Sequence, residues 1–338
     1  MNFSNANAKQ LLSLSRDQVL NLPDRKKLAY FDVVRVRHGR INDVMDDMAS
    51  LLFPENDSDL ILLIGPTGVG KSTLAHSLID KTIQEMMSEI DSNRSCIPIV
   101  RVEAPSNGER SMSWRALYQD ILGQLEEPLI DKKVVDELSD GRRSIRYSTG
   151  GSTIAALRKS VERALVNRGT RVLVVDEAIH LLRQGAVPVV MDTIKSLANT
   201  SNAKIVLLGS YDLFDLLCLN GQVARRSILV PFNRYLPGNK DDEHAFFLTI
   251  RSLEKYWPYE DLPNLWDHRH ALMQASLGCV GILKGTLKRA LAITAKHGGK
   301  WDPNTLKKAA LSKHQLSSIL KEIQEGDRLI EEALSSSM

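Results

Sequence analysis

A glycine-rich segment that directly follows a short apolar run constrains this chain more than any other feature. The run is Leu60–Ile64, and the eight residues after it match the pattern G-x-x-x-x-G-K-[ST] at every fixed position: Gly65, Pro66, Thr67, Gly68, Val69, Gly70, Lys71 and Ser72. Glycines let the backbone curl so that successive N–H groups point inward, where they can hold phosphate oxygens. A helix predicted to begin near Lys71 would add its positive N-terminal end. The segment therefore predicts a phosphate-binding loop between a buried strand and a helix.

The residues at the end of this loop indicate a nucleoside triphosphate with its metal ion. Lys71 can bring its charge to the β- and γ-phosphates, and the Ser72 hydroxyl can ligate Mg²⁺. Thr73, the next residue, completes the predicted nucleotide-binding set. We therefore expect ATP and Mg²⁺ as the ligands of this loop.

A second apolar run, Val172–Val175, predicts the other half of the site. A strand here would deliver Asp176 and Glu177 to its carboxyl end, the edge at which open α/β sheets bind ligands. Asp176 is expected to hold Mg²⁺ through water, and Glu177 to polarise the water that attacks the γ-phosphate. This pair of carboxylates favours an ATPase used as a switch or motor over a small-molecule kinase.

Short apolar runs alternate with helical patterns over the first two thirds of the chain. The predicted strands are 60–64, 97–102, 171–175, 204–208 and 228–232, and the predicted helices among them are 71–90, 114–125, 153–166 and 187–200. Such alternation is typical of an α/β fold in which a parallel sheet carries helices on both faces. We expect four parts: an N-terminal arm and helix (1–50), the α/β core (51–236), a helical lid (237–311) and a C-terminal tail (312–338).

The charge balance and the cysteines exclude several classes of protein. The 338 residues include 44 Lys and Arg against 41 Asp and Glu, a net charge of +3, which excludes a histone-like protein but leaves room for a local basic face. The three cysteines form no zinc-knuckle or disulfide pattern, which fits a reducing cytosol. Apolar runs of strand length only, and an N-terminus without a signal-peptide pattern, lead us to expect a cytoplasmic protein that does not enter a membrane.

Four motifs occur in an order that resembles AAA+ ATPases. They are the phosphate-binding loop, Asp176-Glu177-Ala178-Ile179-His180, the run Leu208-Gly209-Ser210 at a strand end, and Gln222-Val223-Ala224-Arg225-Arg226. In detail, residues 35–300 resemble the TnsC/TniB group of transposition regulators and, more distantly, the MuB protein of phage Mu. The Asp-Glu-x-x-His run, the Ala-Arg-Arg stretch and the Gly278-Cys279-Val280-Gly281 turn are more specific to this group. The resemblance implies a P-loop AAA+ parallel sheet with a small C-terminal helical lid.

The resemblance also implies roles for residues that read the state of the nucleotide. Ser210 falls where AAA+ proteins place a polar sensor of the γ-phosphate. Arg225 or Arg226 falls where one subunit presents an arginine finger to the nucleotide of its neighbour. A guanidinium supplied in this way stabilises charge on the γ-phosphate and makes the nucleotide state depend on assembly.

The predicted lid departs from the family pattern at one position. Many AAA+ lids carry an arginine in a Gly-x-x-Arg turn that touches the γ-phosphate, but Gly281 stands in the arginine slot here. Lys284, one helical turn on, or Lys288 could substitute, and an ordinary surface lysine is the alternative for both. A missing sensor implies slow hydrolysis, which suits a timer better than a motor.

Two basic stretches are the predicted DNA-binding regions. Subunits assembled as a ring or helical filament around double-stranded DNA need basic or polar side chains on loops facing the pore, where they contact phosphates and not bases. The stretches 104–113 and 141–153 meet this need, and in the resembled family these regions carry the DNA-contacting residues. The residues assigned are Arg110, Arg142, Arg143, Arg146 and Thr153. A solvated loop is the alternative for each arginine.

The leading hypothesis is an ATP-dependent, DNA-binding regulator of transposition. It would oligomerise on target DNA, link a TniQ-type target-selection protein, in some systems with a CRISPR effector, to transposase subunits, and disassemble on ATP hydrolysis. One alternative is another AAA+ switch ATPase of the ExeA type, but those proteins would carry a membrane span or a peptidoglycan-binding part. The other is a scaffold that binds nucleotide only as a structural ligand, which would have no need of Glu177.

Overall fold

The computed structural model describes residues 3–53, 59–106, 112–133, 135–139, 142–146, 152–182, 187–214 and 227–335. The chain divides into two compact units. The sheet unit comprises Val44–Gly65 and Lys71–Pro231, and the helical unit comprises Met1–Asp43, Pro66–Gly70 and Phe232–Met338. The phosphate-binding loop is therefore shared, since its middle residues belong to the helical unit.

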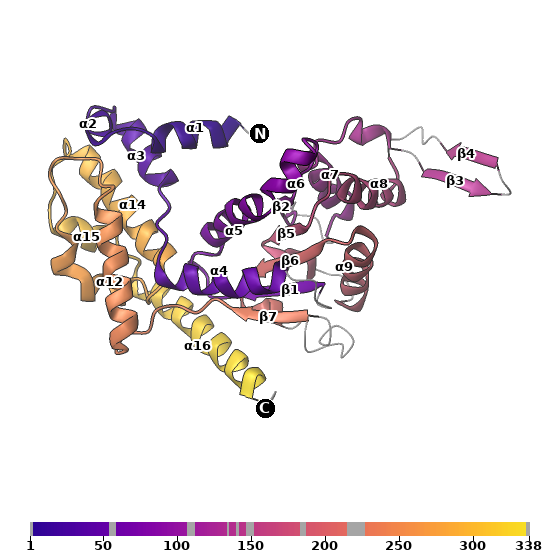
Figure 1. Cartoon of the computed structure of the whole chain (residues 1–338). Coiled ribbons are helices and arrows are strands. Elements are labelled where there is room, and N and C mark those ends of the chain that lie inside the picture. The colour runs from indigo at the N-terminus through magenta and orange to yellow at the C-terminus, as the bar shows by residue number, and fades with distance from the viewer. Residues whose placement is uncertain are drawn as a thin grey trace. The chain divides into compact units, whose positions relative to one another are not determined.

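The sheet unit is built on five parallel strands in the order β2-β5-β6-β1-β7 (Figure 1). The strands are β1 (Leu60–Ile64), β2 (Ile99–Glu103), β5 (Val172–Asp176), β6 (Lys204–Gly209) and β7 (Ser227–Pro231). Every residue of β1, which pairs with both β6 and β7, is at most 2% exposed. This burial explains why the strand is apolar throughout, as expected for a parallel sheet covered on both faces. The predicted α/β fold class is confirmed.

Helices surround this sheet. They are α5 (Lys71–Glu85), α6 (Met87–Ser92), α7 (Trp114–Gln124), α8 (Ile154–Asn167) and α9 (Val187–Ser201), and α4 (Gly39–Leu52) runs into the unit from residue 44 on. The single helix predicted over 71–90 is wrong in one respect, because the helix is interrupted at Met86. The sequence provides an N-cap for α8: the Thr153 hydroxyl accepts the N–H of Ala156, and the helix begins at the next residue, Ile154.

A second, two-stranded antiparallel sheet lies within the stretch expected to be a loop. β3 (Val135–Ser139) pairs with β4 (Arg142–Arg146), so that Ser139 lies opposite Arg142 and Val135 opposite Arg146. The stretch 141–153 was expected to be a loop, and residues 142–146 of it form a strand instead. Figure 1 shows the two strands as a separate ribbon.

The helical unit joins the N-terminal helices to the C-terminal ones. Its helices are α1 (Phe3–Leu12), α2 (Arg16–Leu20), α3 (Asp24–Val33), α12 (Lys240–Glu254), α13 (Arg269–Ala275), α14 (Val280–Lys296), α15 (Asn304–Ala309) and α16 (Lys313–Ser335). Phe31 of α3 is buried in one core with Trp257, Phe246 and Leu283. The rings of Phe31 and Trp257 meet edge to face, with centroids 5.9 Å apart. Burial of these rings stabilises the packing of α3 on the C-terminal helices.

Among the residues that the structure describes, no helix is both long enough and apolar enough to cross a membrane.

Candidate functional site

The first residue of the phosphate-binding loop is fixed by hydrogen bonds within the sheet unit. The N–H of Gly65 donates to the carbonyl of Gly209 at 3.3 Å, which ties the end of β1 to the end of β6. The ammonium Nζ of Lys71 donates to the carbonyl of Gly65 at 2.8 Å. Because Lys71 is the first residue of α5, this bond closes the base of the loop and keeps the positive charge beside it.

The middle of the loop requires its glycines. Gly68 has φ +79° and Gly70 has φ +124°, backbone conformations that side chains disfavour. The N–H of Val69 donates to the carbonyl of Pro66 at 3.2 Å, and the Val69 side chain is buried. The loop is therefore a structured turn whose shape depends on residues without a Cβ.

The first turn of α14 holds the same part of the loop within the helical unit. The N–H of Gly281 donates to the carbonyl of Gly68 at 2.7 Å. A Cβ at position 281 would lie 2.5 Å from that oxygen, closer than non-bonded atoms can approach. No side chain therefore fits at position 281, where the resemblance predicts an arginine.

Asp176 is the last residue of β5 and is 5% exposed. Its Oδ2 lies 2.5 Å from Nη2 of Arg101, and its Oδ1 accepts the N–H of Glu177 at 2.9 Å. Arg101 comes from the neighbouring strand β2 and also contacts His76 of α5 at 3.1 Å. The buried carboxylate is therefore held in one orientation by a charge-assisted bond. Arg101 was not predicted, although an arginine inside an otherwise apolar strand was an available signal.

Glu177 has φ +50°, the left-handed region that a residue with a side chain rarely adopts. Its carbonyl accepts the N–H of His180 at 3.0 Å, and its side chain is exposed. A non-glycine residue held in this region costs about 1–2 kcal/mol, and such strain concentrates at functional positions. The extended backbone of β5 therefore ends between the two carboxylates.

The strand order brings three predicted positions to one edge of the sheet. β6 lies between β5 and β1, so the carboxyl ends that carry Asp176, Ser210 and Gly65 are neighbours. Ser210 follows β6 directly, and its hydroxyl donates to Oδ2 of Asp212 at 3.3 Å. Ser72 and Thr73 lie in the first turn of α5 behind Lys71. This is the edge at which parallel sheets bind their ligands.

Lys284 has partners other than a nucleotide in this structure. Its Nζ donates to the carbonyls of Asp32 and Val34, at 2.7 and 2.5 Å, and burial lowers its pKa to about 8. Lys288, one turn further along α14, forms an ion pair with Asp32 at 2.6 Å. Both lysines thus bind α14 to the end of α3, and the sensor role of Lys284 stays a prediction.

The predicted DNA-binding and finger residues are only partly described. Arg142, Arg143 and Arg146 lie on β4, and the exposed Thr153 uses its hydroxyl as the N-cap of α8. Arg110, Arg225 and Arg226 lie outside the described residues.

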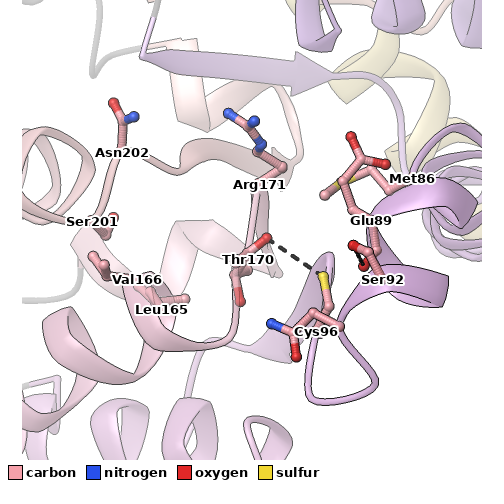
Figure 2. A pocket seen from close by; sticks show the side chains of 12 residues that line it. Met86, Glu89, Ser92, Cys96, Leu165, Val166, Thr170, Arg171, Ser201 and Asn202 are labelled. Atoms are coloured by element: carbon pink, nitrogen blue, oxygen red, sulfur yellow. Dashed lines mark hydrogen bonds between the residues drawn. The ribbon is translucent and has the colours of Figure 1, made fainter.

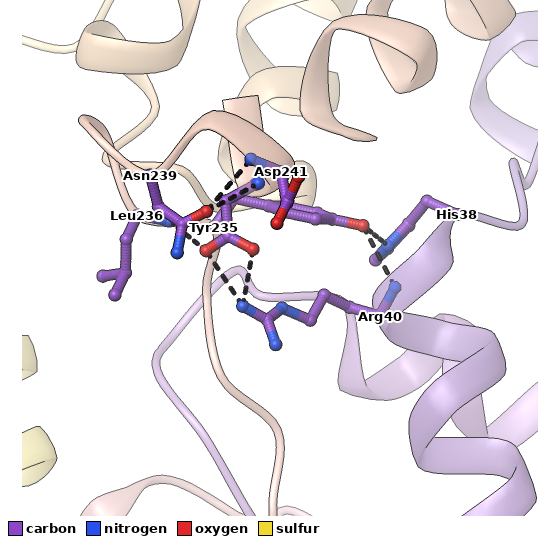
Figure 3. A network of polar contacts seen from close by, with 7 residues as sticks. His38, Arg40, Tyr235, Leu236, Asn239 and Asp241 are labelled. Carbon is purple, nitrogen blue, oxygen red and sulfur yellow. Dashed lines mark hydrogen bonds and ion pairs between the residues drawn. The ribbon is translucent and has the colours of Figure 1, made fainter. Parts of the chain in front are cut away.

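A polar network in the helical unit contains further residues that were not predicted. The hydroxyl of Tyr235 lies 2.9 Å from Nδ1 of His38 and accepts the N–H of Arg40 at 3.1 Å (Figure 3). The guanidinium of Arg40 binds both carboxylate oxygens of Asp242, at 2.8 and 2.9 Å. No motif marks these residues, since His38 and Tyr235 are 197 positions apart.

A pocket of about 380 Å³ lies at the opposite edge of the sheet, among residues that precede strands (Figure 2). Thr170 and Arg171 precede β5, Cys96 precedes β2, and Ser201 and Asn202 precede β6. Burial, and then the charge of Glu89, raises the pKa of the Cys96 thiol. The pocket includes none of the predicted site residues.

Part of the chain is similar to a known family of protein domains. Residues 55–217 match the model of a protein family described as the AAA domain. Among curated protein sequences, none matches this chain significantly. The matched stretch, just under half of the chain, is similar to an AAA domain and contains the loop and both carboxylates.

Two solved structures share the fold. The ORC2 protein of Aeropyrum pernix, determined in ADPNP–ADP complexes, is 14% identical with a TM-score of 0.52, covering 84% of this chain and 71% of that chain. The ORC1 protein of the same organism, determined in complex with DNA, is 16% identical with a TM-score of 0.51, covering 90% of this chain and 68% of that chain. At these identities the likeness extends to the fold alone.

Proposed function

We propose that this protein is an ATP-dependent, DNA-binding AAA+ regulator of transposition that works as a switch. One observation carries the ATPase part of the proposal: the phosphate-binding loop after β1 and the pair Asp176 and Glu177 at the end of β5 lie at the same end of a parallel sheet, with only β6 between the two strands. The transposition part is supported by the resemblance of the Asp-Glu-x-x-His run, the Ala-Arg-Arg stretch and the late glycine turn to TnsC/TniB regulators.

The residues of the site have the chemistry that hydrolysis of Mg-ATP requires. Backbone N–H groups of the loop that are not bonded within it, such as those of Gly68 and Gly70, and the charge of Lys71 would bind the phosphates. The oxygens of Ser72 and Asp176 are hard donors of the type that Mg²⁺ prefers, and the ion would neutralise charge on the β- and γ-phosphates. Arg101 orients the Asp176 carboxylate. Glu177 would accept a proton from the attacking water, and Ser210 would lie near the γ-phosphate.

Assembly completes the site in this proposal. Arg225 or Arg226 of one subunit would reach the nucleotide of the next, so that ATP binding and self-association support each other. The assembled ring or filament would surround double-stranded DNA, with Arg110, Arg142, Arg143, Arg146 and Thr153 in the regions that contact its phosphates. The ORC1 structure in complex with DNA supports DNA binding by a protein of this fold. Transposase subunits and a TniQ-type protein would then bind the assembled state.

The Glu177→Gln variant tests the switch. The substitution keeps size and hydrogen-bonding capacity but removes the basic carboxylate, so Mg-ATP binding and assembly on DNA should persist while hydrolysis falls by about 10²-fold or more. Phosphate release is measured with and without duplex DNA, and the lifetime of the DNA-bound protein is measured after excess competitor DNA is added. The variant should remain bound longer than the wild type.

The control is Glu103→Gln, which removes an exposed carboxylate at the end of the neighbouring strand β2. It should hydrolyse ATP at the wild-type rate. A Glu177→Gln lifetime no longer than that of the wild type would contradict the switch. A wild-type protein that binds ATP but releases no phosphate, with or without DNA, would instead be a nucleotide-bound scaffold.

A further inference from the structure

The imidazole of His38 is buried within the helical unit and has one ring nitrogen without a partner. The residue is 6% exposed, and its ring stacks on Phe232 with an interplanar angle of 19°. Nδ1 lies 2.9 Å from the hydroxyl of Tyr235, whereas Nε2 has no hydrogen-bond partner among the residues that the structure describes. Buried polar atoms are nearly always satisfied, so this nitrogen requires an explanation.

The network around Tyr235 decides which ring nitrogen carries the proton. The N–H of Arg40 donates to the Tyr235 hydroxyl, so the phenolic proton is free to be donated to Nδ1 of His38 (Figure 3). Burial raises the pKa of Tyr235, and burial followed by the charge of Arg40 lowers the pKa of His38 to about 4. Both groups are therefore neutral at pH 7. A neutral imidazole that accepts at Nδ1 carries its proton on Nε2, which makes Nε2–H a buried donor.

This donor lies beside the phosphate-binding loop. A Cβ added at Gly70 would be 3.9 Å from Nε2 of His38 and 3.7 Å from the ring of Phe232. Gly70 has no side chain and a positive φ, so its backbone passes close to both rings. His38, Phe232 and Gly70 all belong to the helical unit.

Tyr235 is itself held firmly in place. Its N–H donates to the carbonyl of Gly278 at 3.1 Å, and a Cβ at Gly278 would lie 1.8 Å from the Tyr235 carbonyl oxygen. Asp242 accepts both the guanidinium of Arg40 and the N–H of Leu236 at 2.8 Å. These contacts fix the backbone of Tyr235 and of the next residue, Leu236. They thereby position the Tyr235 hydroxyl that orients His38.

We propose that His38 binds the nucleotide: its Nε2–H donates to an acceptor atom of the ligand held by the loop, and Tyr235 is the positioning residue that sets its tautomer. This inference rests on the proposed nucleotide site and adds a specificity-determining residue to it. The acceptor is either an atom of the base or ribose or an oxygen of a phosphate. Either kind of atom can accept one hydrogen bond from Nε2–H.

The test measures ligand binding to the full chain by calorimetry. His38→Phe keeps an aromatic ring against Phe232 and Tyr235 but removes the donor, so ATP binding should weaken about tenfold, the usual value of one buried hydrogen bond. His38→Gln restores a donor near the Nε2 position and should recover much of the loss. Without nucleotide, His38→Phe should melt close to the wild-type temperature, because it removes one unsatisfied buried donor but leaves the Tyr235 hydroxyl without its acceptor.

Three comparisons make the result specific. His270→Phe, which changes an exposed histidine that packs on Phe247, should leave ATP affinity unchanged. Inorganic tripolyphosphate distinguishes the acceptors, because a loss seen with both ligands assigns a phosphate, and a loss seen with ATP alone assigns the base or ribose. In ¹⁵N spectra, Tyr235→Phe should move protons from Nε2 to Nδ1 and weaken ATP binding in the same direction.

ATP affinity of His38→Phe equal to the wild type would overturn the inference. The proposed function would survive that result if Lys71→Ala abolished ATP binding in the same assay. A wild-type chain that bound neither ATP nor tripolyphosphate would overturn both.

Discussion

Backbone geometry at single residues sets the strictest requirements in this molecule. Gly68 and Gly70 adopt left-handed conformations in the loop, and Glu177 adopts one without the freedom of a glycine. Gly281 is constrained differently, because its space is filled by the carbonyl of Gly68. A side chain at Gly68 or Gly281 would collide with its neighbours, and a side chain at Gly70 would be strained by the positive φ.

Gly281→Ala should weaken nucleotide binding without preventing folding. The added methyl would meet the Gly68 carbonyl at 2.5 Å, so either α14 or the loop must shift. Overpacking of this kind costs about 1–3 kcal/mol, and we expect a loss of that size in the free energy of unfolding with a roughly 5- to 10-fold loss of ATP affinity. Denaturant titration and calorimetry measure the two effects.

Gly285→Ala is the matched control for that prediction, since it adds the same methyl one turn further along α14. Its Cβ would meet only the end of Arg289 at 3.6 Å. Replacing glycine inside a helix should stabilise the protein by about 1 kcal/mol and leave ATP affinity unchanged. Equal effects of the two substitutions would mean that the contact between Gly281 and Gly68 has no part in binding.

At the level of elements, the β3–β4 ribbon is the main difference from the predicted organisation. In the sequence, Ser139 and Arg142 are separated by two residues, Asp140 and Gly141. Asp-Gly between two strands is a strong hairpin signal, but the basic and polar composition of 128–152 obscured it. The ribbon places three of the arginines assigned to DNA on one short strand, so they belong to one element.

Replacing Arg142, Arg143 and Arg146 with alanine should weaken DNA binding to a similar extent for all sequences. Contacts to phosphates release counterions, so each lost contact should make the slope of log affinity against log salt concentration shallower by roughly 0.9. Binding is measured by anisotropy on unrelated duplexes over a range of salt. The triple replacement of Arg94, Lys159 and Arg163, exposed cations elsewhere in the sheet unit, should leave the slope as it is. An unchanged slope for the β4 variant would remove this strand from the interface.

At the scale of the whole molecule, the chain passes between its two units at residues 43–44, 65–66, 70–71 and 231–232. Two of these crossings are the ends of the middle segment of the phosphate-binding loop. A motif that is contiguous in sequence is therefore covalently part of both units. The proposed assembly would add the arginine finger of a second subunit to the nucleotide site.

Mixing experiments identify the finger. Lys71→Ala should hydrolyse no ATP, because the phosphates lose their cation, and the variant lacking the finger should be equally inactive alone. Mixed subunits should recover hydrolysis, since an intact arginine then meets an intact loop. Arg225→Ala and Arg226→Ala are tested separately against Lys71→Ala by phosphate release. Hydrolysis by both arginine variants alone at the wild-type rate would contradict a finger at either position.

The sequence by itself determined the parts of this protein that lie together along the chain. The apolar strand, the loop and the helix that follow one another from Leu60 to Glu85, and the strand that ends in Asp176, are local patterns that any buried parallel sheet would require. The α/β fold followed from their alternation. The break at Met86 has no glycine or proline to announce it, and composition alone obscured the ribbon.

Only the tertiary structure decided which groups that are distant in the sequence meet within each unit. Arg101 and Asp176 are 75 positions apart, and His38 and Tyr235 are 197 apart. In the sequence, Gly281 stands where the resemblance predicts an arginine. In the fold, its N–H donates to the carbonyl of Gly68. The physical reason is that a local pattern encodes the conformation of its own segment. The partner of a buried polar group is selected by packing of the whole chain, which must satisfy every such group at once.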